Sequence, residues 1–118
     1  MPIHMERPGH EFAIIRATGT PTKADFAGFS DEFERQVRER GKLRILFDAT
    51  QFDGWSSTGI WEELKFDVEH NHDISRLAFV GDKKWQETFV KALKPFTFGR
   101  TRYFEESEMA EAQKWLLA

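Results

Sequence analysis

Two carboxylates and three hydroxyls come directly after a strongly apolar stretch of the chain. Asp48 ends the run KLRILFD, and Asp53, Ser56, Ser57 and Thr58 follow it. Two carboxylates could hold Mg²⁺ for phosphoryl transfer, yet the sequence has no P-loop and no third acidic ligand at a clear spacing. No nucleophile and base can be paired from the sequence either. We therefore expect a protein that is not an enzyme, with no catalytic residues, no metal site and no cofactor.

The same hydroxyls also fit an anion site. Ser56 and Ser57 stand at the start of an expected helix over residues 57–69. A helix N-terminus offers an anion free backbone N–H groups and the positive end of the helix dipole. Ser56, Ser57 and Asp48 are thus candidates for anion binding or phosphorylation. In the simpler interpretation, Ser57 only caps the helix and Asp48 only ends the strand. The residues by themselves leave both interpretations open.

Large aromatic side chains also occupy unusual positions in this part of the chain. Phe52 and Trp55 fall in an otherwise polar turn, and Trp61 and Phe66 fall off the apolar stripe of the helix over residues 57–69. Turns usually carry small polar residues. With twelve Phe and four Trp in a short chain, we expect some of these rings to contact a ligand, a membrane or a partner.

A second aromatic stretch, residues 83–102, is locally basic in an acidic chain. An amphipathic helix of this kind can lie on an anionic membrane, with lysines at the headgroups and rings below them. Alternatively, the rings face the sheet and the lysines face water. The candidate lysines are Lys83, Lys84, Lys91 and Lys94, and the candidate rings are Trp85, Phe89, Phe96 and Phe98.

These residues need a scaffold, and the sequence predicts one. Apolar and β-branched runs over residues 11–18, 42–48, 74–80 and 101–104 are typical of strands, and residues 1–5 fit a short edge strand. Segments with helical spacing of apolar residues separate the later strands. The expected order is β-β-α-β-α-β-α-β-α, an α/β fold with a single mostly parallel sheet and one antiparallel edge pair. Ligands of open parallel sheets usually lie beyond the carboxyl ends of the strands.

Local signals mark where the helices begin and end. Thr22, with Asp25 three residues later, predicts a capping box, and Gly41 predicts the end of that helix. Pro95 is expected to end the helix that follows residue 82, because proline lacks the N–H that a helix interior needs. Ser107 is expected to cap the last helix.

Composition limits the class of protein. The length of 118 residues suits one domain over residues 1–118, and a net charge of -3 excludes the basic field that nucleic-acid binding needs. There is no cysteine and no apolar stretch of membrane-spanning length. We expect a cytoplasmic protein, with peripheral contact at the inner membrane face as an alternative. An exposed aromatic patch could equally serve a homodimer.

Several stretches of the sequence resemble the SpoIIAA-like family. The specific pieces are FDGW, WEELKFD, and VGDKKW followed by KPFT, and with the matching order of elements the likeness covers nearly the whole chain. The resemblance implies the fold of STAS domains, which is related in shape to Sec14-type lipid-binding domains. It also implies a non-catalytic bacterial protein whose mobile helices close over an apolar cavity, with an apolar or lipid-like small molecule or a membrane surface as its partner.

The wider STAS group suggests a second function. Its anti-sigma-factor antagonists are phosphorylated on a serine within an Asp-Ser-Ser-Gly-Leu pattern, and Ser57 lies at the matching position in WSSTGI. Gly59 and Ile60 agree with that pattern, whereas Ser56 stands in place of its aspartate and Thr58 follows Ser57. The alternative to ligand or membrane binding is therefore a regulatory interaction module with phosphorylation at Ser57.

Overall fold

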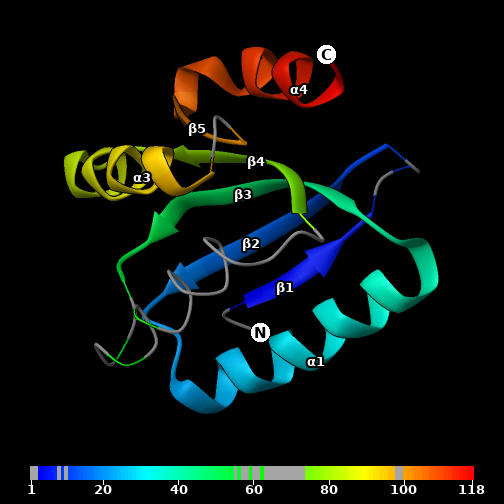
Figure 1. Ribbon diagram of the computed structural model, residues 1–118. Coiled ribbons are helices and arrows are strands. Elements are labelled where there is room, and N and C mark those ends of the chain that lie inside the picture. The colour runs from blue at the N-terminus through cyan, green and yellow to red at the C-terminus, as the bar shows by residue number, and fades with distance from the viewer. Residues whose placement is uncertain are drawn as a thin grey trace.

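The computed structural model describes residues 3–7, 9, 11–54, 56, 59, 62, 74–97 and 100–118, with residues 89 and 92–97 described by their backbone (Figure 1). The elements, in chain order, are β1 Ile3–Glu6, β2 Ala13–Gly19, α1 Lys23–Arg40, β3 Leu43–Phe52, β4 Ile74–Gly81, α3 Lys84–Thr97, β5 Thr101–Glu105, the 3₁₀ turn η1 Glu106–Glu108 and α4 Met109–Leu117.

One five-stranded sheet organises the chain. Its strands lie in the order β1-β2-β3-β4-β5, with β1 antiparallel to β2 and the other neighbours parallel. The predicted α/β class, the mostly parallel sheet and the single antiparallel edge pair are confirmed. Of the helix expected over residues 57–69, the structure describes residues 59 and 62, both in helical conformation, and the rest lies outside the described residues.

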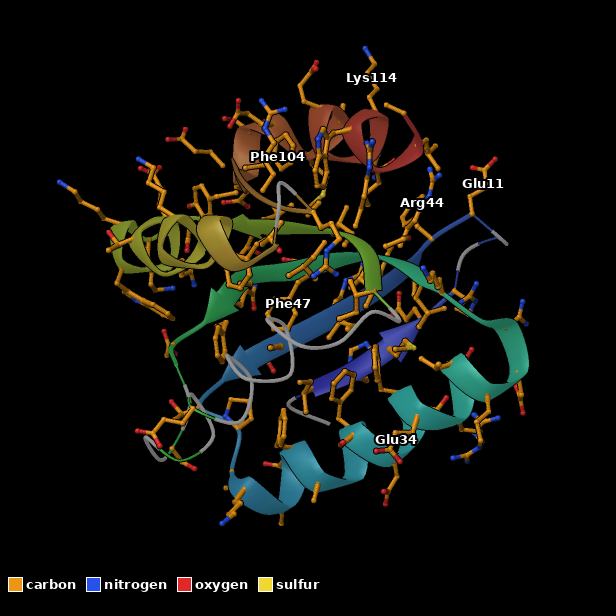
Figure 2. The ribbon with its side chains drawn as sticks, in the orientation of Figure 1. Glu11, Glu34, Arg44, Phe47, Phe104 and Lys114 are labelled. Atoms are coloured by element: carbon orange, nitrogen blue, oxygen red, sulfur yellow. The ribbon has the colours of Figure 1, made fainter. Side chains whose placement is uncertain are left out.

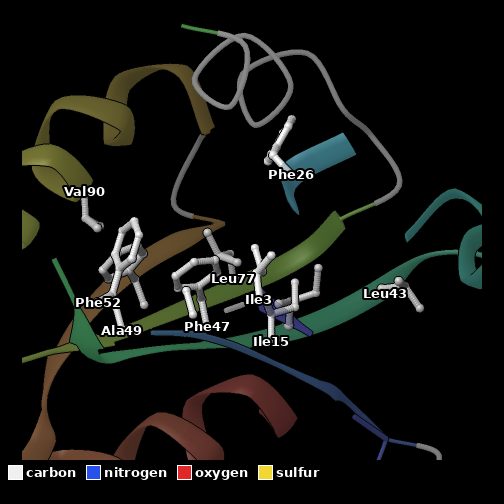
Figure 3. Packing of buried hydrophobic residues seen from close by; sticks show 12 residues of the cluster. Ile3, Ile15, Phe26, Leu43, Phe47, Ala49, Phe52, Leu77 and Val90 are labelled. Carbon is white, nitrogen blue, oxygen red and sulfur yellow. The ribbon is translucent and has the colours of Figure 1, made fainter. Parts of the chain in front are cut away.

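Helices α1 and α3 pack on one face of the sheet. Phe26 of α1 and Val90 of α3 belong to one buried cluster with Ile15, Phe47 and Phe52 from the strands. Figure 3 shows these side chains between the sheet and the two helices. Helix α1 is held at both ends as predicted: Thr22 and Asp25 form the capping box, and Gly41 ends the helix with φ 78.

Helix α4 packs on the opposite face. Ala112 and Leu116 are buried against Leu46, Val80 and Phe104 of the strands. The labelled side chains in Figure 2 show the two faces, with Phe104 and Arg44 toward α4 and Phe47 on the other side. At the end of α4, the Arg44 guanidinium donates to the Leu116 carbonyl at 2.6 Å, where a cation complements the helix dipole.

Three boundaries differ from those expected. Strand β3 extends to Phe52, so this ring belongs to the strand and not to the turn. Helix α3 continues past Pro95 to Thr97, so the loss of the single N–H donor at Pro95 does not end the helix. Ser107 is not the cap of the last helix: it lies inside η1, where the Glu108 carboxylate accepts from the Glu105 N–H at 2.9 Å.

Candidate functional site

A bulge near the end of β3 shapes the carboxyl edge of the sheet. Arg16 of β2 pairs with Asp48, but Thr18 pairs with Gln51, so β3 carries one extra residue. The Asp48 carboxylate accepts from the Thr50 N–H at 3.1 Å and from the Thr50 hydroxyl at 2.7 Å. Asp48 also lies 3.5 Å from Arg16 Nε. Asp48 therefore stabilises the bulge.

The bulge turns Phe52 into the core. Side chains alternate between faces along a regular strand, which would place Phe52 opposite Phe47 and Ala49. The extra residue changes that alternation, and all three belong to the cluster beneath α1 and α3. Phe52 is 1% exposed, with its ring centroid 6.1 Å from that of Phe47.

Gln86 joins the end of β3 to the start of α3. Its side chain is 0% exposed, and its Nε2 donates to the Ala49 carbonyl at 3.1 Å and to the Phe52 carbonyl at 3.2 Å. Its Oε1 accepts from the Asp82 N–H at 3.1 Å and from the Lys83 N–H at 3.4 Å. The side-chain amide of Gln86 thus forms hydrogen bonds with backbone groups of two segments that are far apart in the sequence.

Gly81 leaves the space that Gln86 occupies. A Cβ at this position would overlap Gln86 Oε1 and would lie 3.2 Å from Tyr103 Cε2. Residue 81 must therefore be glycine, because the Gln86 side chain approaches too closely for a Cβ atom. Sequence reasoning missed Gln86, although its position one helical turn before the buried Val90 is a usable signal.

Lys83 points back to the sheet and not away from it. Its ammonium donates to the Phe52 carbonyl at 3.2 Å and lies 3.3 Å from Asp82 and 3.7 Å from Asp53. Of the other candidate lysines, Lys91 pairs with Glu87 at 3.0 Å, and Lys84 is exposed. The side chain of Lys94 lies outside the described residues.

Trp85 contacts the aromatic rings of the core and also reaches the surface. Ring centroids are 6.0 Å apart between Trp85 and Phe52, and 5.0 Å apart between Phe47 and Phe79. With the Phe47 and Phe52 pair, these contacts form a row of rings from the centre of the sheet to α3. Trp85 is 37% exposed, and within the described part of the chain the other exposed large apolar side chain is Leu117.

A pocket of about 480 Å³ lies beside the start of α3 and the carboxyl ends of β4 and β5. The lining residues are Gly81, Asp82, Lys83, Lys84, Glu87, Tyr103, Glu105, Glu106 and Ser107. Burial raises the pKa of Tyr103, and the charges of Glu87 and Glu105 raise it further. Carboxylates thus dominate the electrostatics around this phenol.

The comparisons with known proteins agree with this architecture. Residues 12–117 match the SpoIIAA-like family. The chain belongs to the SpoIIAA-like family. A similar solved structure is an uncharacterized protein from the DUF3478 family of Shewanella loihica PV-4, described as having a SpoIIAA-like fold. The two are 26% identical with a TM-score of 0.76, over 97% of this chain and 91% of that one. No curated protein gives a match.

Several predicted site residues of this SpoIIAA-like domain lie outside the described residues. They are Trp55, Ser57, Trp61, Phe66 and Phe98, together with the side chains of Phe89 and Phe96. Ser56 is described and exposed, and its N–H donates to the Pro21 carbonyl at 3.2 Å. That N–H is therefore engaged within the chain. The phosphorylation of Ser57 stays a prediction.

The two carboxylates considered for Mg²⁺ have separate partners. Asp48 lies beside Arg16, whereas Asp53 lies beside Lys83. Over the described ranges, no three acidic, histidine or cysteine side chains are grouped as metal ligands would be. No described helix is both long enough and apolar enough to cross a membrane.

Proposed function

We propose that this SpoIIAA-like domain is a non-catalytic protein that binds lipid reversibly through the surface around Trp85. The observation that carries the proposal is the Trp85 indole, which is 37% exposed on an amphipathic helix and packs against the core ring of Phe52 in a tilted arrangement. An indole with one apolar and one hydrated side suits the boundary between water and acyl chains. Lys84, next in the chain, adds an exposed cation that an anionic headgroup attracts.

The expected affinity is modest. Burying the exposed third of a Trp side chain, roughly 90 Å² of about 250 Å², contributes about 2 kcal/mol. A lysine near an anionic surface adds about 1 kcal/mol. Because Lys83 and Lys91 already have carboxylate neighbours, their contribution is smaller. Together these contributions give a binding free energy of a few kcal/mol, which corresponds to reversible and salt-sensitive binding to a lipid surface.

Sedimentation with vesicles tests the proposal. The protein is expected to pellet with phosphatidylglycerol vesicles more than with phosphatidylcholine vesicles, and less as salt rises. Trp85→Ser should abolish binding, whereas Leu117→Ser, at the other exposed apolar side chain, should leave it unchanged. Lys84→Glu should weaken binding to the anionic vesicles, and Lys114→Glu on α4 serves as its matched control.

A second arm distinguishes a bound lipid molecule from a membrane surface. Native mass spectrometry of the gently purified protein would detect extra mass that is lost on denaturation and recovered in an organic extract. Such mass with no vesicle binding identifies a single lipid as the ligand. Equal vesicle binding by wild type and Trp85→Ser, together with a bare native mass, would refute the proposal.

A further inference from the structure

The connections that follow β4 and β5 leave the sheet on opposite faces. After β4 the chain enters α3, whose Val90 is buried in the cluster shared with α1. After β5 it passes through η1 into α4, whose Leu116 is buried on the other face. Neighbouring parallel strands whose connections separate in this way leave a crevice beyond their carboxyl ends, which is where ligands of open α/β sheets bind.

The pocket of about 480 Å³ lies in this crevice. Residues from the start of α3 line one side of it, and residues from β5 and η1 line the other. Gly81, at the end of β4, is buried and adds no side chain to the cavity. The volume is that of a small-molecule site. Glu106 and Ser107, which line it, are exposed, so a ligand can enter from solvent.

Three of the lining side chains offer polar groups that the described chain leaves unused. The Tyr103 hydroxyl, the Ser107 hydroxyl and the Glu106 carboxylate form no hydrogen bond or ion pair with any residue that the structure describes. The Tyr103 ring is stacked on Phe79, with ring centroids 6.3 Å apart. This stacking holds the phenol oxygen at the cavity wall, where it can accept a hydrogen bond from a ligand.

Negative charge dominates at this phenol. Burial raises the pKa of Tyr103, and the charges of Glu87, Glu105 and Asp82 raise it further. Lys83, which also lines the pocket, is paired with Asp82 at 3.3 Å. A cation is therefore the kind of ligand that the charges around the cavity favour.

The carboxylates are spread around the cavity and are not gathered at one point. Among the described residues, no three acidic, histidine or cysteine side chains are grouped as metal ligands would be. Asp82 and Glu87 belong to the α3 side, whereas Glu105 and Glu106 belong to the side formed by β5 and η1. An extended cation with several ammonium groups can contact both sides, because each ammonium carries N–H donors and no acceptor.

We propose that this pocket binds a linear aliphatic polyamine. One ammonium group donates to the Glu106 carboxylate and to the Tyr103 hydroxyl oxygen, and a second donates to Glu87 on the α3 side. The methylene chain between them lies along the Tyr103 ring, as lysine stems lie along apolar surface. Lys84 lines the same cavity and opposes binding by charge repulsion. The site goes beyond the lipid contact of Trp85 and does not depend on it.

Titration calorimetry of the full chain with spermidine at constant ionic strength tests the site. Wild type is expected to bind spermidine saturably, putrescine more weakly, and butylamine and Mg²⁺ more weakly still. Replacing Glu105 and Glu106 together by glutamine should weaken spermidine binding about tenfold, because charge-assisted hydrogen bonds are lost. The matched control, Glu11→Gln with Glu34→Gln, makes the same change in net charge at exposed residues outside the pocket and should stay within twofold.

Two further variants separate this site from lipid binding. Lys84→Glu should strengthen spermidine binding although it weakens binding to anionic vesicles, and Trp85→Ser should leave spermidine affinity within twofold. Tyr103→Phe keeps the stacked ring but removes the hydroxyl, and it should weaken spermidine binding about threefold. These directions hold whether or not the protein binds lipid.

A spectroscopic readout locates the bound polyamine. In a ¹H–¹⁵N spectrum, spermidine should shift the amide signals of Gly81 and Ser107 but not that of Gly41, which precedes β3 at the opposite edge of the sheet. Mg²⁺ binding as tight as spermidine binding would identify a general counterion effect and overturn the proposal. Equal spermidine affinity in wild type and in the Glu105 and Glu106 double variant would overturn it as well.

Discussion

Replacing Gln86 by leucine removes the side chain that joins β3 to α3 while keeping similar volume. The amide is fully buried and makes four hydrogen bonds, two to carbonyls of β3 and two from N–H groups at the start of α3. Leucine fills most of the space, so lost packing contributes little. The cost comes from backbone groups left without a partner.

The four backbone groups do not contribute equally. The Phe52 carbonyl keeps the Lys83 ammonium at 3.2 Å, and the Asp82 N–H belongs to an exposed residue that water can reach. The Ala49 carbonyl, on a residue with 0% exposure, loses its side-chain donor. With about 1–3 kcal/mol for each orphaned buried group, Gln86→Leu should lower the free energy of unfolding by about 2–4 kcal/mol. In a domain of this size, that lowers Tm by roughly 8–16 °C.

Urea unfolding followed by far-UV circular dichroism measures this change. Gln113→Leu on the exposed side of α4 is the matched control and should stay within about 0.5 kcal/mol of wild type. Gly81→Ala should destabilise the wild type by displacing the Gln86 amide, and should cost less in a Gln86→Ala background. If Gln86→Leu matched wild type, or the two sites were additive, the reasoning would be refuted.

Other contacts give predictions of their own. Thr22→Ala should lower stability in urea by about 1 kcal/mol through loss of the α1 cap, and an unchanged midpoint would contradict it. The Thr22 N–H lowers the pKa of Asp25, so this carboxylate stabilises the fold above pH 3.8 and stops doing so as pH falls; Asp25→Asn should flatten the acid branch of a pH series of urea midpoints. Tyr103 is the single tyrosine, so absorbance at 295 nm should give a native midpoint above 10.0 that falls to about 10 in urea, and stability should decline as pH rises through this range. Arg44→Met should lower the free energy of unfolding, measured in urea, by about 1–2 kcal/mol, because the hydrogen bond to the Leu116 carbonyl at the end of α4 is lost. Lys114→Met should change this free energy little.

Signals that act over a few residues were predictable from the sequence. The Thr22 and Asp25 pair fixes the start of α1 by local hydrogen bonds, and Gly41 fixes its end because its backbone adopts a positive φ. Strand runs separated by helical spacing likewise predicted the mixed sheet, since burial on both faces selects continuous apolar residues such as those around Leu46.

Features that depend on distant partners were not predictable. Phe52 falls in the predicted turn because the apolar run ends at Asp48 and polar residues follow it; the bulge, fixed by pairing with β2, lets the strand continue and turns Phe52 into the core. Gln86 finds its carbonyl partners 34 and 37 residues away.

The spatial order of the strands equals their order in the chain, which has a consequence for synthesis. Each new strand pairs with the strand made just before it, so the sheet can grow by one strand at a time as the chain leaves the ribosome. Of the described helices, α4 covers the face that carries Leu46, Val80 and Phe104, and it is made last. The part of this face that α4 covers stays without that helix until residues 109–117 emerge, so a stalled or shortened chain exposes these apolar side chains and is prone to aggregate.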